Sequence, residues 1–259
     1  MELNNYRAFT AQLKTNVASD ERVLGLIAMG SMAEINRTPD EWSDHDFFLI
    51  TVPDVQEDFR QDLSWLPNPE QIVMTIRETA HGLKVLYQEG HLLEFAVFDR
   101  EELSLAKCND YRVLIDRDNL EPLLVKASER PLIKPALQVD TKMVIALIYV
   151  GTGRYARGEY LSAHVFLKHH LLHHLLRLVS YIVPADNKDR LDNLDPFRRF
   201  EVVYPVIGAE INRLLMLPVP ECGLGLLDLL DQHIAPLLDD YPAEAVEVVR
   251  QYVMKGLAE

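Results

Sequence analysis

Cysteine, basic residues and long apolar runs are all scarce in this chain of 259 residues. The two cysteines, Cys108 and Cys222, lie far apart without metal-ligand spacing, so we expect reduced thiols. The longest apolar run, residues 143–150, is too short to span a bilayer. The N-terminal residues lack the basic and then apolar pattern of a signal peptide. These absences predict a cytoplasmic protein that does not associate with membranes.

Positive charge is in short supply relative to negative charge. There are 40 Asp and Glu residues against 26 Lys and Arg residues, which gives a formal net charge of -14. A surface of this sign repels phosphate backbones, so nucleic acid is disfavoured as a partner and a polycationic small molecule is favoured. With 48% apolar and 25% charged residues, the composition is that of an ordinary globular protein.

Hydrophobic periodicity gives the first part of the chain a mixed α/β character, because short apolar strands alternate with amphipathic helices. The expected helices cover residues 3–18 and 54–64, and the expected strands cover 23–29, 45–52, 71–76, 83–88, 91–98 and 112–115. The strands 83–88 and 91–98 flank Glu89-Gly90, which predicts a hairpin.

The second part of the chain predicts an α-helical bundle, with helices over 139–158, 160–183, 205–216, 223–238 and 242–257. On the second helix, apolar residues at three- and four-residue steps predict a stripe that faces the core. Its members are Leu161, Val165, Leu172, Leu175, Val179 and Ile182. Pro122, Pro131 and Pro135 cluster at 120–138 and mark the boundary, so we predict an α+β fold with domains at 1–130 and 131–259.

The segment between residues 29 and 50 carries the strongest chemical signal. A Gly30-Ser31 turn ends one apolar strand, and Asp44 and Asp46 open the next. Side chains at i and i+2 of a strand share a face, so these two carboxylates lie side by side. Glycine lets a backbone approach a ligand closely, and Ser31 offers a hydroxyl. The pattern predicts a site that holds magnesium against phosphate, although a strand-ending turn with solvated aspartates has the same residues.

Glu94 is the third acidic residue of interest, because it lies within an otherwise apolar strand. A buried carboxylate is costly unless it is paired or bound to metal. If its strand neighbours that of Asp44 and Asp46, three carboxylates converge, and Glu94 could bind metal or accept a proton. The alternative is a residue on the exposed face of an edge strand.

These motifs together resemble the signature of the polymerase-beta-type nucleotidyltransferase superfamily. Residues 149–159 and 173–180 resemble the helical domain of aminoglycoside 6-adenylyltransferases. Residues 195–205 are similar to a stretch of lincosamide nucleotidyltransferases. The likeness extends over about residues 20–210.

The resemblance implies an N-terminal nucleotidyltransferase catalytic domain and a helical substrate-binding domain. It also implies ATP or another nucleoside triphosphate as donor, two magnesium ions, and release of pyrophosphate. Carried over, Gly30 and Ser31 would contact the phosphates, and Asp44, Asp46 and Glu94 would be catalytic and bind metal. Related enzymes often carry a lysine on the first C-terminal helix; Thr152 stands near that place here, and Arg154 would supply the charge.

Five histidines share one predicted helix, at positions 164, 169, 170, 173 and 174. His169 with His173, and His170 with His174, stand at the i, i+4 spacing of metal-binding pairs. No glutamate lies between them as in zinc proteases, so we interpret them as lining a substrate cleft or a helix interface rather than zinc ligands. Arg198 and Arg199 could bind phosphate, but we favour a surface pair that bridges to Glu201 or Asp195.

The predicted reaction is magnesium-dependent transfer of a nucleoside monophosphate, AMP from ATP, to a hydroxyl of a small molecule such as an aminoglycoside or lincosamide antibiotic. Such an enzyme would confer antibiotic resistance. The alternative is a catalytically degenerate scaffold of the same fold that binds nucleotide or a protein partner. The expected partners are a nucleoside triphosphate and a cationic acceptor, without nucleic acid or membrane, for a monomer or homodimer.

Overall fold

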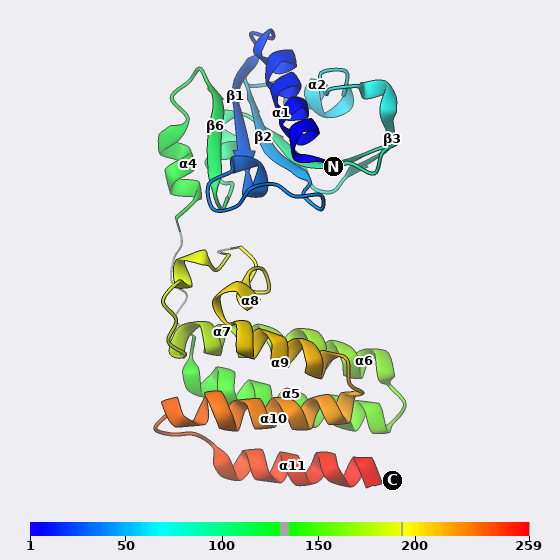
Figure 1. Cartoon of the computed structure of the whole chain (residues 1–259), viewed down its shortest axis with the longest axis vertical. Coiled ribbons are helices and arrows are strands. Elements are labelled where there is room, and N and C mark those ends of the chain that lie inside the picture. The colour runs from blue at the N-terminus through cyan, green and yellow to red at the C-terminus, as the bar shows by residue number, and fades with distance from the viewer. Residues whose placement is uncertain (130–134, 193, 259) are drawn as a thin grey trace. The chain divides into compact units, whose positions relative to one another are not determined.

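The structure is a computed structural model that describes residues 1–129, 135–192 and 194–258. The chain divides into two compact units, Met1–Arg130 and Pro131–Glu259, each of which is described by itself (Figure 1). Among the described residues, the helices are either too short or too polar to cross a membrane.

The N-terminal unit is built on one six-stranded sheet with the order β3-β4-β5-β2-β1-β6. Its strands are β1 (Val23–Met29), β2 (His45–Thr51), β3 (Ile72–Arg77), β4 (Gly82–Tyr87), β5 (Leu92–Phe98) and β6 (Tyr111–Asp116). Strands β2 and β5 pair in parallel, whereas the other neighbouring pairs are antiparallel. The sheet is therefore mixed, as predicted, and the parallel pair brings together two strands that are distant in sequence.

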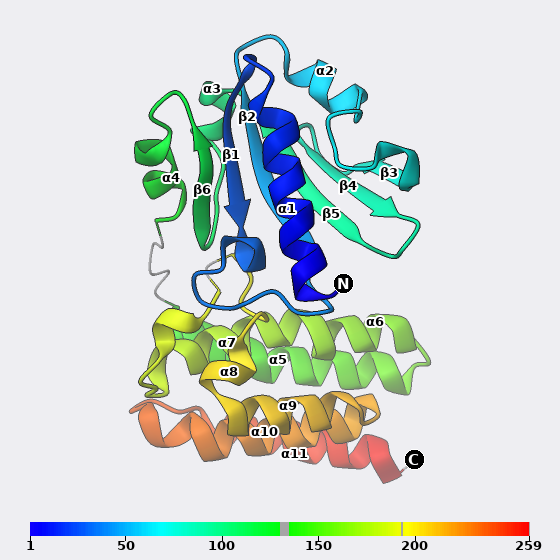
Figure 2. The same ribbon diagram turned by 45° about the horizontal axis from the view of Figure 1, so that its top comes forward.

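Helices cover both faces of this sheet (Figure 2). The first face, which we call the α1 face, packs against α1 (Leu3–Ala18) and α2 (Gln56–Gln61). The opposite, α4 face packs against α3 (Arg100–Leu103) and α4 (Glu121–Ala127). Apolar residues spaced three or four apart along α1 form its buried stripe, namely Tyr6, Phe9, Leu13 and Val17.

Alternation along β2 and β5 decides which residues reach which face. Phe47 and Phe95 stack in the core of the α1 face, with ring centroids 4.9 Å apart. Because successive side chains of a strand point to opposite faces, Asp46 and Glu94 belong to the α4 face. Ile50 and Phe98 lie farther along the same face and join its apolar core.

The C-terminal unit is a helical bundle with a core of its own. Its helices are α5 (Leu137–Ala156), α6 (Tyr160–Val165), α7 (Leu171–Ile182), α8 (Phe200–Val203), α9 (Pro205–Leu215), α10 (Val219–His233) and α11 (Ala243–Ala258). Short turns complete the two units: η1 (Gly30–Ala33), η2 (Pro69–Gln71), the π-helical η3 (Phe166–His170), η4 (Lys188–Arg190) and η5 (Ala235–Leu237). The predicted α+β fold, with a mixed sheet and a C-terminal helical region, is confirmed.

The apolar stripe predicted over 160–183 is wrong at its N-terminal end. Leu161 is 86% and Val165 45% exposed, whereas Ala163 and Leu167 are fully buried. The cause is the π-helical turn η3, which lies between α6 and α7 and adds a residue to the helix. The added residue rotates the buried face, so a constant helical period fits only the part of the stripe beyond η3.

Two details of the predicted elements can be compared with the structure. The proline-marked segment 120–138 contains a helix, because α4 occupies part of it and packs Leu124 and Ala127 into the core of the α4 face. Pro131 lies outside the described residues. The predicted hairpin is present as β4 and β5, although the strand ends are joined by four residues, 88–91, rather than by two.

Candidate active site

The turn after β1 brings the backbone close to an acidic side chain. Gly30 has φ +52°, a left-handed conformation that favours glycine, and its N–H donates to the Asp110 carbonyl oxygen at 2.9 Å. A Cβ atom at Gly30 would lie 3.5 Å from Asp46 Oδ2. The Asp46 carboxylate is therefore beside the turn, as the Gly30-Ser31 motif predicts.

Ser31 is 1% exposed, and its Oγ makes no hydrogen bond of regular geometry within the described part of the chain, although it lies beside the Tyr6 hydroxyl and lowers the pKa of that group. Burying a hydroxyl without a regular hydrogen bond costs free energy, so such groups are uncommon unless they serve a ligand. Arg112, which the sequence analysis missed, braces the same turn by donating from Nη2 to the Met32 carbonyl oxygen at 3.1 Å. The turn thus offers a held backbone and a buried hydroxyl.

The structure brings Asp46 and Glu94 together. They are direct partners in the parallel register of β2 and β5 and point to the same face. Strands in a sheet lie about 4.8 Å apart, so the two side chains are neighbours. Asp44 lies two residues before Asp46, just outside β2, and its carbonyl oxygen accepts a hydrogen bond from the Tyr6 hydroxyl at 2.7 Å.

The premise that Glu94 is buried is wrong, since its side chain is 46% exposed. Alternation explains this: Leu93 and Phe95 take the buried positions on the α1 face, and Glu94 is left on the other. Lys84 Nζ, on β4, stands 3.5 Å from the Glu94 carboxylate and 2.8 Å from that of Glu78. The hydrogen bond to Glu78 raises the pKa of Lys84 above its ordinary value, and the negative charge of Glu94 adds to the rise. This lysine was not predicted as a site residue, although the hairpin register could have revealed it.

The donor chemistry of Asp44, Asp46 and Glu94 suits magnesium, which prefers carboxylate oxygens together with substrate phosphates. Among the residues that the structure describes, three or more His, Cys, Asp or Glu side chains do not gather into a group that could hold a metal ion. Magnesium commonly uses only one or two protein carboxylates and completes its shell with phosphate and water. The register pair of Asp46 and Glu94, beside the Gly30 turn, fits that kind of site.

Tyr6 joins this acidic neighbourhood from α1. Burial raises the pKa of its hydroxyl, and the nearby negative charges of Asp44 and Asp46 add to the rise. The hydroxyl stays protonated and can donate to the Asp44 backbone at any physiological pH. Because Tyr6 also belongs to the apolar stripe of α1, its sequence pattern indicated a core residue and gave no sign of this second role.

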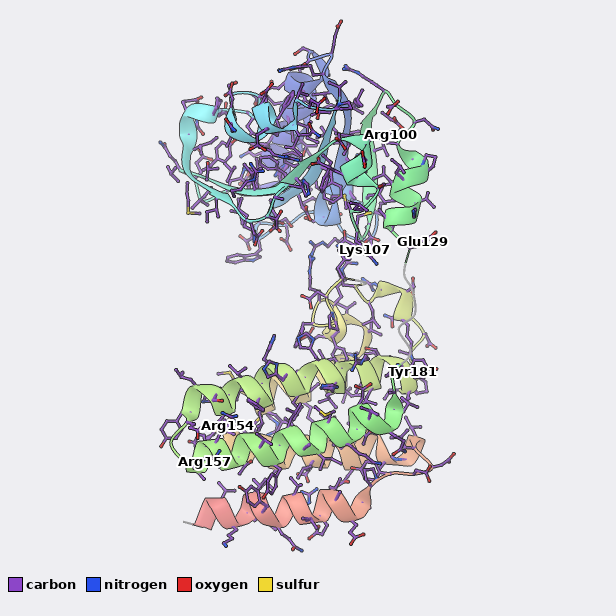
Figure 3. The ribbon with its side chains drawn as sticks, turned by 180° about the vertical axis from the view of Figure 1, so that it is seen from behind. Arg100, Lys107, Glu129, Arg154, Arg157 and Tyr181 are labelled. Carbon is purple, nitrogen blue, oxygen red and sulfur yellow. The ribbon has the colours of Figure 1, made fainter. Side chains whose placement is uncertain are left out.

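Arg154 lies in the helical unit, at the C-terminal end of α5, where Figure 3 shows it beside Arg157 and away from Tyr181 of α7. Its Nη1 donates to Glu159 at 3.0 Å and to Ser162 at 2.9 Å. The guanidinium also lies over the Phe166 ring, 4.6 Å from the centroid. The charge of Arg154 is thus already engaged by α6 and η3.

Thr152 is 2% exposed and packs inside the helical unit, within 4 Å of where Cβ atoms of Gly223 and Gly256 would lie. A lysine at this position would extend into the core, so Thr152 does not mark where a phosphate-binding cation would stand. Lys142 is exposed on the same helix, about 18 Å from Arg154 along the axis at 1.5 Å per residue. It is a candidate that the sequence analysis missed.

The histidines of the predicted helix fall into two groups. His169 and His173 have ring centroids 4.9 Å apart, and His173 meets Phe197 edge to face at 4.6 Å. His174 Nδ1 lies 2.6 Å from the Asp140 carboxylate instead. The Arg198 guanidinium lies 3.7 Å from the Asp192 carboxylate. This partner differs from Glu201 and Asp195, the two that the sequence favoured.

Comparison with known proteins adds a family assignment. The sequence model of the streptomycin adenylyltransferase family matches residues 7–192. No curated protein matches the chain. One similar solved structure is an aminoglycoside 6-adenyltransferase from Bacillus subtilis, with 12% identity, TM-score 0.40, and coverage of 96% of this chain and 97% of that one. Another is a STING-associated CdnE c-di-GMP synthase from Capnocytophaga granulosa, with 13% identity, TM-score 0.31, and coverage of 99% and 80%.

Proposed function

The chain belongs to the streptomycin adenylyltransferase family and is a nucleotidyltransferase, and from this premise we propose that it transfers AMP from ATP to a hydroxyl of a small cationic acceptor. The observation that supports the proposal is the in-register pair of Asp46 and Glu94 beside the Gly30-Ser31 turn. Paired carboxylates next to a phosphate-binding turn are what in-line attack on an α-phosphorus requires.

Asp44, Asp46 and Glu94 are proposed to hold magnesium, which when bound would neutralise charge on the triphosphate and on the attacking hydroxyl. The other residues bind and orient. Gly30 would let the phosphates approach the backbone, and the buried Ser31 hydroxyl would donate to them.

A cation of α5 is proposed to contact the triphosphate. Arg154 is one candidate, but it would have to give up Glu159 and Ser162 to reach a nucleotide. Lys142 is exposed and needs no such exchange, so we favour it. The two candidates stand near opposite ends of the helix and can be tested separately.

The N-terminal unit is proposed as the catalytic domain, over residues 1–130, and the helical unit, over residues 131–259, as the acceptor-binding domain. The net charge of -14 favours a polycation, so an aminoglycoside suits the protein better than a lincosamide. Modification of such a drug would give resistance to it.

The test uses ATP labelled at the α-phosphate or at the γ-phosphate, magnesium, and a panel of aminoglycosides and lincosamides. We expect label from the α-position alone to appear on an aminoglycoside, with release of pyrophosphate. Calorimetric binding of ATP without a labelled product from any acceptor would contradict the proposal and favour a nucleotide-binding scaffold. Label transferred from the γ-position would indicate a phosphotransferase instead.

A further inference from the structure

Directly behind the carboxylates, on the α1 face, lies a buried pair of histidines. His45 stands between Asp44 and Asp46 in the chain, and His91 precedes β5, 46 residues later. The two residues are 0% and 7% exposed. His45 Nδ1 and His91 Nε2 are 2.7 Å apart, a hydrogen bond between the rings. Two imidazoles buried in an apolar core are costly unless each is satisfied, so their pairing calls for a physical reason.

The partners of His45 assign its tautomer. Thr10 Oγ1 donates to the Tyr6 carbonyl oxygen at 3.1 Å, which uses its only hydrogen. His45 Nε2 lies 2.9 Å from Thr10 Oγ1 and 3.2 Å from that carbonyl oxygen. Both oxygens can then only accept, so Nε2 of His45 carries the hydrogen. Its Nδ1 is therefore the acceptor, and His91 donates from Nε2.

This assignment requires the His45 ring to be neutral, because its Nδ1 can accept only when it carries no hydrogen. Burial lowers the pKa of His45 to about 3, with the neighbouring His91 adding to the effect. His91 can donate from Nε2 in either protonation state. Burial lowers the pKa of His91 to about 4, and the positive charge of the N-terminus adds to the effect. At neutral pH the chain of donors therefore runs without interruption from His91 through His45 to the backbone of α1.

The pair joins three elements at the level of the carboxylates. His45 is the first residue of β2, and His91 directly precedes β5. The Tyr6 ring stacks on His45 at 3.7 Å, and its hydroxyl holds the Asp44 carbonyl oxygen at 2.7 Å. A slip of β2 against β5 by one residue would turn Asp46 away from the face of Glu94. The hydrogen bond between the histidines opposes such a slip at the strand ends, where pairing is weakest.

We propose that His45 and His91 are positioning residues that hold Asp44, Asp46 and Glu94 in the arrangement that binds the metal and nucleotide. The inference rests on the proposed function, because it assigns these carboxylates to metal binding. Groups that orient metal ligands from behind typically change metal affinity or activity by about 10- to 100-fold when removed.

The main test compares His45→Phe, His91→Phe and the double variant in the full-length protein. Phenylalanine keeps an aromatic ring against Tyr6 at position 45 and against Phe9 at position 91, but removes the nitrogens. Each single variant leaves a buried nitrogen without its partner, whereas the double variant removes both. We therefore expect the double variant to regain part of the melting temperature that the single variants lose, while its Mn²⁺ affinity stays about tenfold weaker than that of the wild type.

Mn²⁺ binding is measured by electron paramagnetic resonance in the presence of α,β-methylene ATP, and kcat and the Mg²⁺ dependence follow on the labelled acceptor. Val97→Ala is the matched control, because Val97 is fully buried on β5 on the same face but lies away from the carboxylates. It should lower the melting temperature and leave Mn²⁺ affinity within about twofold, since only packing is removed.

A double variant with wild-type Mn²⁺ affinity and kcat would overturn the proposal and leave the pair a packing feature. If the double variant does not fold, Thr10→Val and Thr10→Ser decide: the first removes the hydroxyl beside His45 and should weaken Mn²⁺ binding, and the second keeps it and should not. Equal Mn²⁺ affinities for these two would also overturn it, as would a wild-type protein that binds no Mn²⁺. A wild type that binds Mn²⁺ but labels no acceptor would refute the proposed function while the variants still decide the inference.

Discussion

A buried polar cluster of the N-terminal unit and a buried polar cluster of the helical unit are built differently. In the N-terminal unit, His45 and His91 are neutral, and His45 finds its partners inside the core. In the helical unit, Asp140 carries a carboxylate with a side chain only 4% exposed, which His174 and Arg177 of α7 contact from its wetter side. One cluster is sealed and uncharged, whereas the other is open and ionic.

The difference follows from what each cluster joins. Strands β2 and β5 already exchange backbone hydrogen bonds, so the histidines add only a choice of register. Helices α5 and α7 satisfy their own backbones and need a side-chain contact to fix one against the other. A buried carboxylate contacted by the Arg177 guanidinium and the His174 ring gives that contact, at the expense of desolvating a charge. We infer that the sealed cluster shapes a site and the open one supports a fold.

The variant with the largest expected effect tests whether Asp46, on the opposite face of β2 from His45, is needed for catalysis and not for stability. Asp46→Asn should lower kcat/KM by about 1,000-fold or more, equivalent to about 4 kcal/mol of transition-state stabilisation. The melting temperature should change little, because Asp46 is not part of the apolar core. Steady-state kinetics and calorimetry check the two halves.

Asp58→Asn is the control for that variant, since the Asp58 side chain is 67% exposed and its ion pair with Arg22 spans 3.5 Å. It should leave both readouts unchanged. If Asp46→Asn instead unfolds the N-terminal unit, the carboxylate has a structural role. The distinction between a catalytic residue on the α4 face of β2 and a structural residue on its α1 face would then be wrong.

The second prediction concerns the open cluster. Asp140→Asn should destabilise the helical unit by about 2 kcal/mol, because it removes hydrogen bonds to a buried charged acceptor, while the partly exposed Arg177 and His174 can turn to water. Asp239→Asn, at an exposed position, is the matched control. Urea unfolding followed by circular dichroism at 222 nm gives the free energy. A loss no larger than that of the control would mean that helix packing alone holds α5 against α7.

Local patterns predicted much of the site as well as the elements. The i, i+2 spacing of Asp44 and Asp46 and the turn at Gly30 are short-range features, and the strand boundaries followed from runs of apolar residues. Glu94 was selected as an acidic residue inside such a run. Its neighbour Lys84 needed the register of β4 against β5, which is a long-range property.

The remaining features depend on contacts that periodicity does not encode. His45 and His91 are 46 positions apart, and nothing in either segment indicates that their rings meet. The π-helical turn η3 breaks the helical period without a proline or glycine to announce it. The five clustered histidines are conspicuous in the sequence, yet two of the four isolated ones, His45 and His91, form the buried pair.

The third prediction concerns the stability that the sealed histidine cluster loses as the pH falls. His91 has a pKa of about 4 in the folded protein, because of burial, against 6.5 for an unperturbed histidine. Between these values the unfolded chain binds more protons, so stability is present above about pH 6.5 and is lost as the pH falls towards 4. The expected loss for His91 between pH 7 and pH 5 is about 2 kcal/mol.

Trp42 and Trp65 are the only two tryptophans, and both lie in the N-terminal unit, so tryptophan fluorescence, excited selectively over tyrosine, reports the unfolding of that unit. His91→Gln should flatten the pH dependence of this signal relative to the wild type. His164→Gln, on the helical unit, should leave the slope as it is. Parallel slopes for wild type and His91→Gln would show that His91 is not the group that loses stability in acid.

The smallest effect distinguishes the two cations of α5, and with them the part that the helical unit has in nucleotide binding. Lys142→Ala should raise KM for ATP about tenfold, or about 1.4 kcal/mol, if its exposed ammonium contacts the triphosphate. Arg154→Ala should chiefly lower the melting temperature, because it removes the ties of α5 to Glu159 and Ser162. The opposite pattern, with KM raised by Arg154→Ala alone, would assign the phosphate contact to Arg154. It would also show that the guanidinium leaves Glu159 and Ser162 when nucleotide binds. An ion pair of the helical unit would then serve binding as well as folding.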